Sequence, residues 1–145
     1  MFDQIEKAKT KGLKIGFTAS TFDLLHPGHI AMLAEAKANC QFLVVGLLTD
    51  PTISRPEKEK PVQTMLERYI QIQAVRFVDM VVPFETEEEL EQLLLTIMPD
   101  IRFIGEEYKN TNHTGREIEG ITNYYNKRKH KFSSTDLRDR LRKTK

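Results

Sequence analysis

Strand-like segments alternate along the chain with segments in which apolar residues recur at helical spacing. The strand-like segments are residues 14–19, 42–48, 78–83, 101–104 and 122–125. Parallel strands that are covered on both faces read as short apolar runs, and the connections between them are helices. The alternation therefore predicts an α/β fold in which five parallel strands form a sheet flanked by helices.

Apolar residues three and four positions apart mark the helices between these strands. The sets are Ile30, Leu33 and Ala34, then Met65, Leu66, Tyr69 and Ile72, then Leu90, Leu93, Leu94 and Ile97. Thr86 and Glu89 have the spacing of a capping box before the third helix, and Pro99 ends that helix. A last helix is expected to begin near Ser134 and to run to Arg142.

The length of 145 residues suits a single domain, residues 1–145, with one core. No apolar run approaches the roughly 18 residues that a membrane-spanning helix needs, and residues 1–14 lack the apolar centre of a signal peptide. Cys40 is the only cysteine, which excludes an internal disulfide. We expect a cytoplasmic protein with no membrane partner.

The formal net charge of +1 hides an uneven distribution of charge. Residues 85–91 hold five glutamates, whereas residues 127–145 hold nine basic and two acidic side chains. A basic end suits a phosphate-bearing partner, but a solvated helix face explains the residues after Asp139 equally well. The basic end alone would also suit a module that binds nucleic acid.

The first strand is followed by a polar segment that leads into a helix. Pro27 suits the first helical position, so His26 caps the helix and His29 lies one turn further on the same side. Two hydrogen-bond donors beside a helix N-terminus suit an anion whose charge grows during a reaction, and a phosphoryl transition state is such an anion. By spacing alone, a metal site or an ordinary helix surface remains an open alternative.

Residues 21–29, Thr-Phe-Asp-Leu-Leu-His-Pro-Gly-His, resemble the H-x-G-H signature of a nucleotidyltransferase superfamily. Within that superfamily the chain looks closest to glycerol-3-phosphate cytidylyltransferase, and the likeness extends over residues 13–142. The resemblance implies a Rossmann-like fold in which His26 and His29 hydrogen-bond the α-phosphate of a nucleoside triphosphate and stabilise the transition state. It also implies a homodimer, and Mg²⁺ that is held mainly by oxygens of the nucleotide, with no metal ligands from the chain.

The same resemblance assigns further residues around the first helix. Asp23 would line the site of the second substrate. Ser20 stands where the family usually has glycine, and serine is small enough for the backbone to approach a phosphate. The residues that would contact the nucleotide are Thr18, Ser20, Thr21, Phe22 and Gly28.

The loop after the second strand offers cationic residues for catalysis and substrate binding. The family places a lysine here, followed eight residues later by an arginine on a helix, and Lys60 and Arg68 have that spacing, with Lys58 as the rival lysine. By resemblance, Lys60 would neutralise phosphate charge in the transition state. Arg76 begins a stretch that resembles the family's Arg-Tyr-Val-Asp, and Arg68 and Arg76 would contact the acceptor's phosphate or the base. For Arg76, a structural ion pair is an equal alternative.

Residues 105–108, Gly-Glu-Glu-Tyr, follow the fourth strand and resemble a Gly-Asp-Asp-Trp stretch of cytidylyltransferases. By resemblance, Gly105, Glu106 and Tyr108 would form the nucleoside pocket. Both acids are one methylene longer than in the family, and an exposed turn is the alternative explanation.

Residues 128–135, Arg-Lys-His-Lys-Phe-Ser-Ser-Thr, align with the family's Arg-Thr-Glu-Gly-Ile-Ser-Thr-Thr. The resemblance implies that Arg128 and the residues at the helix start bind the β- and γ-phosphates. Those residues are Ser133, Ser134 and Thr135. The spacing of Ser133 and Asp136 also fits a capping box, which needs no ligand. Residues 129–131, Lys-His-Lys, depart from the family pattern by replacing a glycine and adding positive charge.

Together these residues predict an enzyme that transfers CMP from CTP to a phosphorylated small alcohol such as glycerol 3-phosphate. Pyrophosphate leaves and a CDP-linked product forms, with no covalent enzyme intermediate. The alternative is an adenylyltransferase that uses ATP and an acceptor such as phosphopantetheine or nicotinamide mononucleotide. A nucleic-acid-binding module is the third possibility, but it needs neither the paired histidines nor the hydroxyl-rich helix start, so we expect no nucleic acid partner.

Overall fold

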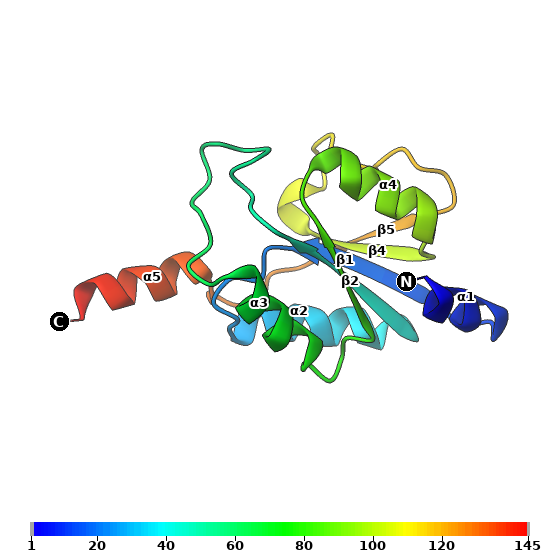
Figure 1. Cartoon of the computed structure of the whole chain (residues 1–145), viewed down its shortest axis with the longest axis horizontal. Coiled ribbons are helices and arrows are strands. Elements are labelled where there is room, and N and C mark those ends of the chain that lie inside the picture. Colours follow the sequence, from blue (N-terminus) through cyan, green and yellow to red (C-terminus); the bar gives the residue numbers. More distant parts are fainter. Residues whose placement is uncertain (1, 145) are drawn as a thin grey trace.

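Five parallel strands form the centre of the structure, a computed structural model that describes residues 2–144 (Figure 1). In chain order they are β1 (Ile15–Ser20), β2 (Phe42–Leu48), β3 (Met80–Phe84), β4 (Ile101–Gly105) and β5 (Thr122–Asn126). In space the order is β3-β2-β1-β4-β5, so the strand order reverses between β1 and β4. The predicted α/β fold with a parallel sheet is confirmed, and each observed strand overlaps its predicted segment.

The helices cover both faces of this sheet. They are α1 (Asp3–Thr10), α2 (Pro27–Ala38), α3 (Met65–Gln73), α4 (Glu87–Ile97) and α5 (Ser134–Lys143). Figure 1 shows α2 and α3 on one face of the sheet and α4 on the other. The four helices that the sequence predicts are present. The pattern does not predict α1, because only Ile5 and Ala8 of its eight residues are buried.

The second strand shows how the core is shared between two layers. Val44 belongs to the apolar cluster that includes residues of α1 and α4, whereas Leu43 and Val45 belong to the cluster that includes residues of α2 and α3. Successive side chains of a strand point to opposite faces, so a strand covered on both sides needs apolar residues at every position. For this reason residues 42–48 read as a continuous apolar run.

Carboxylates bind backbone N–H groups at the amino ends of the strands. Asp100 Oδ2 accepts a hydrogen bond from the backbone N–H of Ile15 at 2.8 Å, and Asp79 Oδ2 accepts one from the backbone N–H of Leu43 at 2.8 Å. Side chains therefore satisfy the N–H of the first residue of β1 and of the second residue of β2. The loops that carry most of the predicted site residues leave the sheet at the opposite, carboxyl edge.

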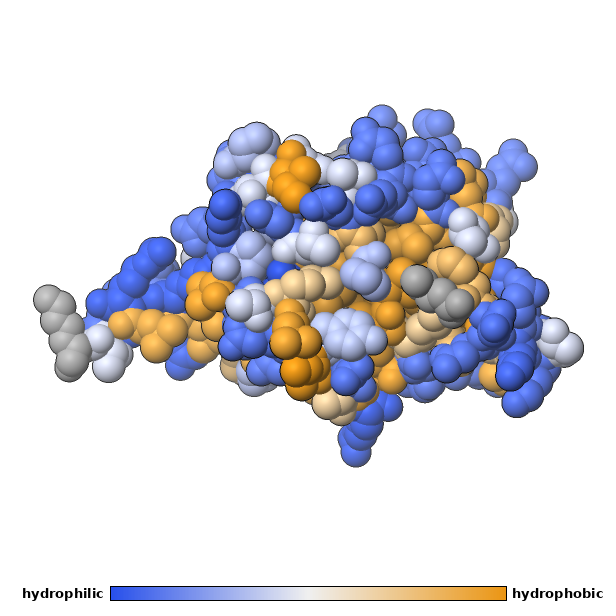
Figure 2. Space-filling view, in the orientation of Figure 1, coloured by the Kyte–Doolittle hydropathy of each residue, from blue (hydrophilic) through white to orange (hydrophobic). Residues whose placement is uncertain are grey.

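The last helix extends away from the sheet, and none of its residues is buried (Figure 1). Figure 2 shows apolar side chains along α5 and over α3, and Leu66, Ile70 and Leu141 are exposed there. The start of α5 is anchored, because Ser134 Oγ donates a hydrogen bond to the backbone carbonyl of Asp23 at 2.8 Å. No helix among the described residues has the length and apolar character needed to cross a membrane.

Candidate active site

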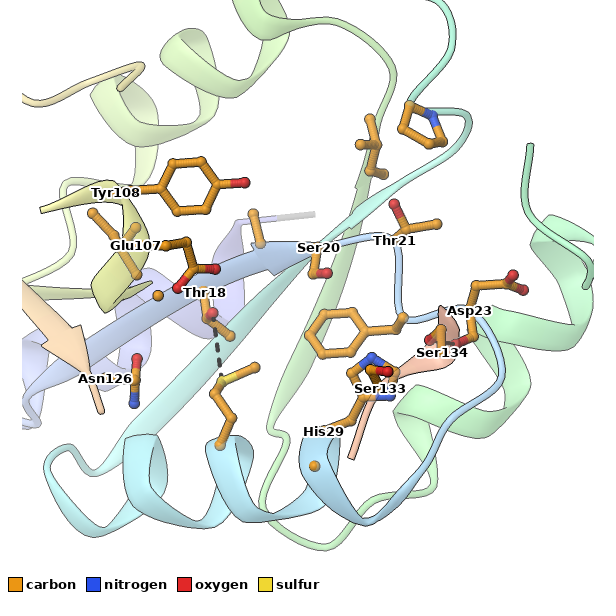
Figure 3. A pocket seen from close by; sticks show the side chains of 18 of the residues that line it. Thr18, Ser20, Thr21, Asp23, His29, Glu107, Tyr108, Asn126, Ser133 and Ser134 are labelled. Carbon is orange, nitrogen blue, oxygen red and sulfur yellow. Dashed lines mark hydrogen bonds between the residues drawn. The ribbon is translucent and has the colours of Figure 1, made fainter. Parts of the chain in front are cut away.

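A cavity of about 1080 Å³ opens at the carboxyl ends of β1 and β4, where the strand order reverses. In open α/β sheets this is the position at which ligands bind. Figure 3 shows side chains from the loop after β1, the start of α2, the turn after β4 and the start of α5 converging on it. Most predicted site residues line it: Thr18, Ser20, Thr21, Phe22, Asp23, His26, Gly28, His29, Gly105, Tyr108, Arg128, Ser133, Ser134 and Thr135.

The two histidines of the H-x-G-H segment are held at the start of α2. His26 is the N-cap residue and Pro27 is the first helical residue, as the sequence predicts. The backbone N–H of Gly28 donates to His26 Nδ1 at 3.0 Å, and the backbone N–H of His26 donates to His29 Nδ1 at 3.2 Å. The two rings stack with their centroids 3.8 Å apart.

These contacts decide which nitrogen of each ring carries the hydrogen. Because Nδ1 of both His26 and His29 accepts a hydrogen bond, a neutral ring holds its hydrogen on Nε2. Burial and the neighbouring His26 lower the pKa of His29 to about 4. Burial, His130 and Arg128 lower the pKa of His26. His29 is therefore neutral at pH 7, and the shift of His26 favours the same form, in which Nε2–H is a donor.

Gly28 allows these rings to lie where they do. A Cβ atom on Gly28 would lie 2.6 Å from His130 Cε1 and 2.8 Å from His26 Cε1. Carbon atoms do not approach this closely, so any larger residue would displace one of the two imidazoles. The glycine of the H-x-G-H segment is therefore required by packing.

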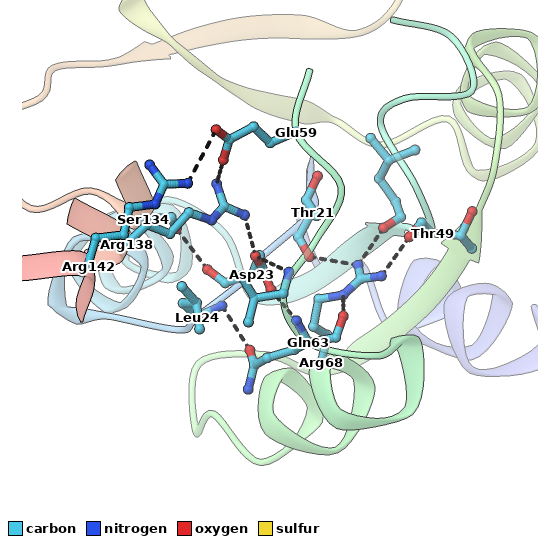
Figure 4. Close-up of polar contacts among 12 residues, drawn as sticks. Thr21, Asp23, Leu24, Thr49, Glu59, Gln63, Arg68, Ser134, Arg138 and Arg142 are labelled. Carbon is cyan, nitrogen blue, oxygen red and sulfur yellow. Dashed lines mark hydrogen bonds and ion pairs between the residues drawn. The ribbon is translucent and has the colours of Figure 1, made fainter. Parts of the chain in front are cut away.

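Asp23 joins the loop after β1 to two other segments (Figure 4). Its Oδ2 accepts from the backbone N–H of Val62 at 2.8 Å and from Arg138 Nη2 at 2.6 Å, and its Oδ1 accepts from the backbone N–H of Gln63 at 2.9 Å. Arg138 Nη1 also lies 3.1 Å from Glu59 Oε2. Asp23 lines the cavity, as predicted, and both carboxylate oxygens also bind groups of the protein, so it positions the segments around the cavity; its contact with a substrate stays a prediction.

Arg68 is placed differently from its prediction. Its side chain is buried, with 2% of its surface exposed, and it does not line the cavity. The guanidinium donates to four backbone carbonyls, at 3.2, 3.0, 2.6 and 2.6 Å; these belong to Gln63, Thr21, Leu48 and Thr49, respectively (Figure 4). The structure therefore assigns Arg68 to holding the loops after β1 and β2 in place of the predicted contact with acceptor or base.

Three more predicted residues do not line the cavity: Arg76, Lys60 and Glu106. Arg76 is exposed, with its guanidinium 4.9 Å from the centre of the Phe77 ring. It follows α3 near the amino edge of the sheet, so it lies away from the carboxyl-edge cavity. Lys58 lines the cavity in place of Lys60.

In the turn after β4, Glu107 occupies the position in the cavity predicted for Glu106. Glu107 lines the cavity and Glu106 does not. Glu107 folds back over the strand end, since a Cβ atom on Gly105 would lie 2.5 Å from its carboxylate oxygens. Glu106 Oε1 accepts a hydrogen bond from the backbone N–H of Arg128 at 3.3 Å and so links this turn to the loop before α5.

The start of α5 lines the same cavity as the start of α2, and Figure 3 shows Ser133, Ser134 and His29 among its lining side chains. Ser133 is the N-cap residue, and its Oγ accepts from the backbone N–H of Asp136 at 3.0 Å, which is one of the two hydrogen bonds of the predicted capping box. A helix N-terminus presents unpaired backbone N–H groups. Two helix N-termini therefore converge on one cavity, which is suited to an anion.

Sequence reasoning missed a polar network between α2 and β5. Glu35 Oε1 accepts from the Tyr124 hydroxyl at 3.0 Å, and Glu35 Oε2 accepts from Asn126 Nδ2 at 2.8 Å. Asn126 Oδ1 is buried and has no hydrogen-bond partner among the described residues. Glu35 and Asn126 line the cavity. Asn126 ends strand β5, and a polar residue at the end of a parallel strand is a signal from which it could have been predicted. Glu35 is a polar residue within a helix, and nothing in the sequence distinguishes it from a solvent-exposed one.

A second missed group lies beside α4. Arg102 is buried, lines the cavity and donates to the backbone carbonyl of Thr114, whose hydroxyl donates to Glu87 Oε2 at 2.6 Å. Arg55, from the loop after β2, also lines the cavity. A hydrogen bond with the Tyr108 hydroxyl raises the pKa of Arg55. This part of the cavity therefore carries two cations that the family pattern did not indicate.

The family model described as Cytidylyltransferase-like matches residues 17–140 of this chain. The chain belongs to the cytidylyltransferase-like family. This places it among the nucleotidyltransferases and confirms the superfamily indicated by residues 21–29.

Curated relatives match most of the chain. The chain is 36% identical over 117 residues to the bifunctional protein HldE of Gluconacetobacter diazotrophicus, covering 80% of the chain and 24% of the relative. It is 40% identical over 116 residues to HldE of Acidiphilium cryptum, covering 79% of the chain and 24% of the relative. The chain thus spans about a quarter of the length of these relatives.

Solved structures share the fold of this family. The lipopolysaccharide core biosynthesis protein of Thermoplasma volcanium superposes with a TM-score of 0.59 at 23% identity, covering 91% of this chain and 88% of that protein. Pantothenate synthetase of Thermus thermophilus superposes with a TM-score of 0.63 at 17% identity, covering 86% of this chain and 61% of that enzyme. At these identities the likeness concerns the fold.

The substitution Arg68→Met tests the structural role of the buried guanidinium. It leaves four carbonyls without their donor, so we expect the free energy of unfolding to fall by at least about 2 kcal/mol. The matched change Arg76→Met, at an exposed residue, should alter it by no more than about 0.5 kcal/mol. Urea unfolding of both variants measures the difference. Equal stability, with only a raised KM for the acceptor in Arg68→Met, would support the substrate contact instead.

Proposed function

We propose that this protein transfers CMP from CTP to a phosphorylated small alcohol and releases pyrophosphate. The observation that carries the proposal is the convergence of two Nε2–H donors and two helix N-termini on one cavity. Such donors stabilise negative charge that develops on phosphate oxygens during the reaction. Membership of the cytidylyltransferase-like family supports nucleotidyl transfer.

In the proposed reaction, a phosphate oxygen of the acceptor attacks the α-phosphorus of CTP. A bond forms between that oxygen and the α-phosphorus, and the bond from the α-phosphorus to the oxygen bridging to the β-phosphate breaks in line with it. The electron pair leaves with pyrophosphate. His26 and His29 would donate to the α-phosphate oxygens, because both Nε2–H groups are neutral donors beside a helix N-terminus.

The β- and γ-phosphates would lie at the start of α5. Ser133 Oγ already caps the N–H of Asp136, and Ser134 Oγ already donates to the carbonyl of Asp23. We therefore propose that the backbone N–H groups of Ser134 and Thr135 make the contacts there, with Arg128 nearby. No group of three or more His, Cys, Asp or Glu side chains among the described residues is arranged to hold a metal ion. We propose that Mg²⁺ would be bound mainly by triphosphate oxygens, where it would neutralise their charge.

For the acceptor's phosphate, the structure supports different cations from those of the family pattern. Arg68 is engaged in the protein, and Arg76 lies away from the cavity. We propose that Arg55 and Arg102 take this role, because both line the cavity on the side of α4. A guanidinium suits a phosphate through paired N–H donors.

The free oxygen of Asn126 supports a nucleotide whose base carries an amino group. The orientation of the Asn126 amide follows from Glu35, whose carboxylate can only accept a hydrogen bond when ionised and so fixes Nδ2 toward it. The remaining Oδ1 is a buried acceptor without a partner among the described residues. Cytosine and adenine both carry an exocyclic amino donor, whereas uracil has a carbonyl there. This contact therefore favours CTP and ATP alike, and an adenylyltransferase is the second candidate function.

A pyrophosphate-release assay tests the proposal directly. Purified protein with Mg²⁺ is incubated with CTP, ATP or UTP against glycerol 3-phosphate, ethanolamine phosphate, choline phosphate and ribitol 5-phosphate, and mass spectrometry identifies the product. We expect release with CTP, and His29→Ala should lower kcat by roughly a hundredfold to a thousandfold because one transition-state donor is lost. The exposed Arg76→Ala is the control. Release with ATP alone would establish the second candidate, and silence with every pair would refute both.

The substitution Asn126→Ala tests the choice of base. The wild-type protein should prefer CTP to UTP, and ATP to inosine triphosphate, because uracil and hypoxanthine carry a carbonyl oxygen, which cannot donate to Asn126 Oδ1, in place of the amino group. In Asn126→Ala, the ratio of kcat/KM for CTP to that for UTP, and the same ratio for ATP and inosine triphosphate, should each fall roughly tenfold or more toward one. Glu35→Gln should weaken the preference as well, since a glutamine lets the Asn126 amide rotate. Ratios measured within one variant do not depend on its stability, and unchanged ratios in both variants would remove Asn126 from base selection.

A further inference from the structure

A third histidine lies beside the H-x-G-H pair. His130 belongs to the loop between β5 and α5, and it lines the cavity together with His26 and His29. Its Cε1 lies 2.6 Å from the position that a Cβ atom on Gly28 would take, while His26 Cε1 lies 2.8 Å from the same position. The Cε1 edges of the His26 and His130 rings therefore both lie over Gly28.

The ring of His130 is oriented in the same way as those of the pair. The backbone N–H of Phe132 donates to His130 Nδ1 at 3.1 Å, and the His130 and Phe132 rings pack with centroids 5.3 Å apart. Because Nδ1 is an acceptor, the neutral ring carries its hydrogen on Nε2. His26, His29 and His130 thus all have Nδ1 bound to a backbone N–H and Nε2–H left as the donor.

The chain position of His130 places it between the two anion-binding helix starts. Its ring lies over Gly28 of α2. In the chain it lies three residues before Ser133, the N-cap of α5. In the proposed reaction the first helix start faces the α-phosphate and the second faces the β- and γ-phosphates. The group between them is the oxygen that bridges the α- and β-phosphates. That oxygen gains negative charge as its bond to the α-phosphorus breaks.

The residue type at this position fits such a contact. In the family segment aligned with residues 128–135, the position of His130 holds a glutamate, which would repel a phosphate. Here it is an imidazole whose remaining ring N–H can donate. The motif therefore does not assign this role, and it follows from the geometry of this chain.

We propose that His130 is a third catalytic donor, whose Nε2–H hydrogen-bonds the departing pyrophosphate oxygen; this inference rests on the proposed nucleotidyl transfer. No proton leaves the ring in this step. The electron pair of the broken bond stays on the pyrophosphate oxygen, and the hydrogen bond stabilises its charge. A histidine that only packs on Gly28 and Phe132 is the alternative.

Three substitutions separate these roles. His130→Phe keeps a ring that can pack on Phe132 but removes both nitrogens, and His130→Gln keeps an N–H donor near the position of Nε2. We expect kcat to fall roughly tenfold to a hundredfold in His130→Phe, with KM for the acceptor within about twofold, and to recover in large part in His130→Gln. Lys131→Ala, which removes a neighbouring exposed charge, should change kcat less than about threefold.

The acidity of the leaving group gives a readout that packing would not move. The wild-type and His130→Phe proteins are compared with β,γ-methylene and β,γ-difluoromethylene analogues of the nucleotide that the wild-type protein uses. The difluoro leaving group is more acidic and needs less help, so the ratio of wild-type to variant kcat should be several-fold smaller with it. An equal ratio with both analogues, or equal kcat for the wild-type and His130→Phe proteins, would overturn the role of His130. If the wild-type protein uses no nucleotide at all, the proposed function itself has failed, and this inference fails with it.

Discussion

Two hydrogen bonds at the start of α2 determine what the rest of the site can do. The N–H of Gly28 binds Nδ1 of His26, and the N–H of His26 binds Nδ1 of His29, so both side chains cap the helix with Nδ1 and carry the hydrogen of the neutral ring on Nε2. Both residues line the cavity. A cap of this kind satisfies backbone donors that every helix N-terminus leaves unpaired. The same contacts therefore serve the stability of the helix and the orientation of the two proposed catalytic groups.

The second constraint is the set of contacts that keeps the two helix starts together. Asp23 follows β1 and binds the backbone before α3, while Arg138 of α5 binds Asp23 and Glu59. The loops after β1 and β2 and the start of α5 are thus connected through one buried carboxylate. Arg68 adds hydrogen bonds to the loops after β1 and β2. Residues that a family pattern suggests as substrate contacts here hold the segments that surround the cavity.

Much of the fold and part of the site could be predicted from the sequence, because the signals concerned are local. Apolar runs reveal strands, Pro27 reveals the start of α2, and the likeness of residues 21–29 to H-x-G-H places both histidines correctly. The roles of Arg68 and Arg76 could not be read this way, since spacing does not show whether an arginine is buried or faces a ligand. The contact of Glu35 with Asn126 joins residues 91 positions apart, and only the sheet topology brings them together.

The state of the two capping histidines is the claim on which the account depends, and nitrogen NMR of histidine side chains measures it. Long-range correlation of ring nitrogens with ring hydrogens distinguishes the two neutral forms from the charged one. In the free protein at pH 7 we predict that His26 and His29 are neutral with the hydrogen on Nε2, and that His29 gains a proton only near pH 4. A hydrogen on Nδ1 in either ring, or protonation of His29 near its ordinary pKa of 6.5, would contradict the account.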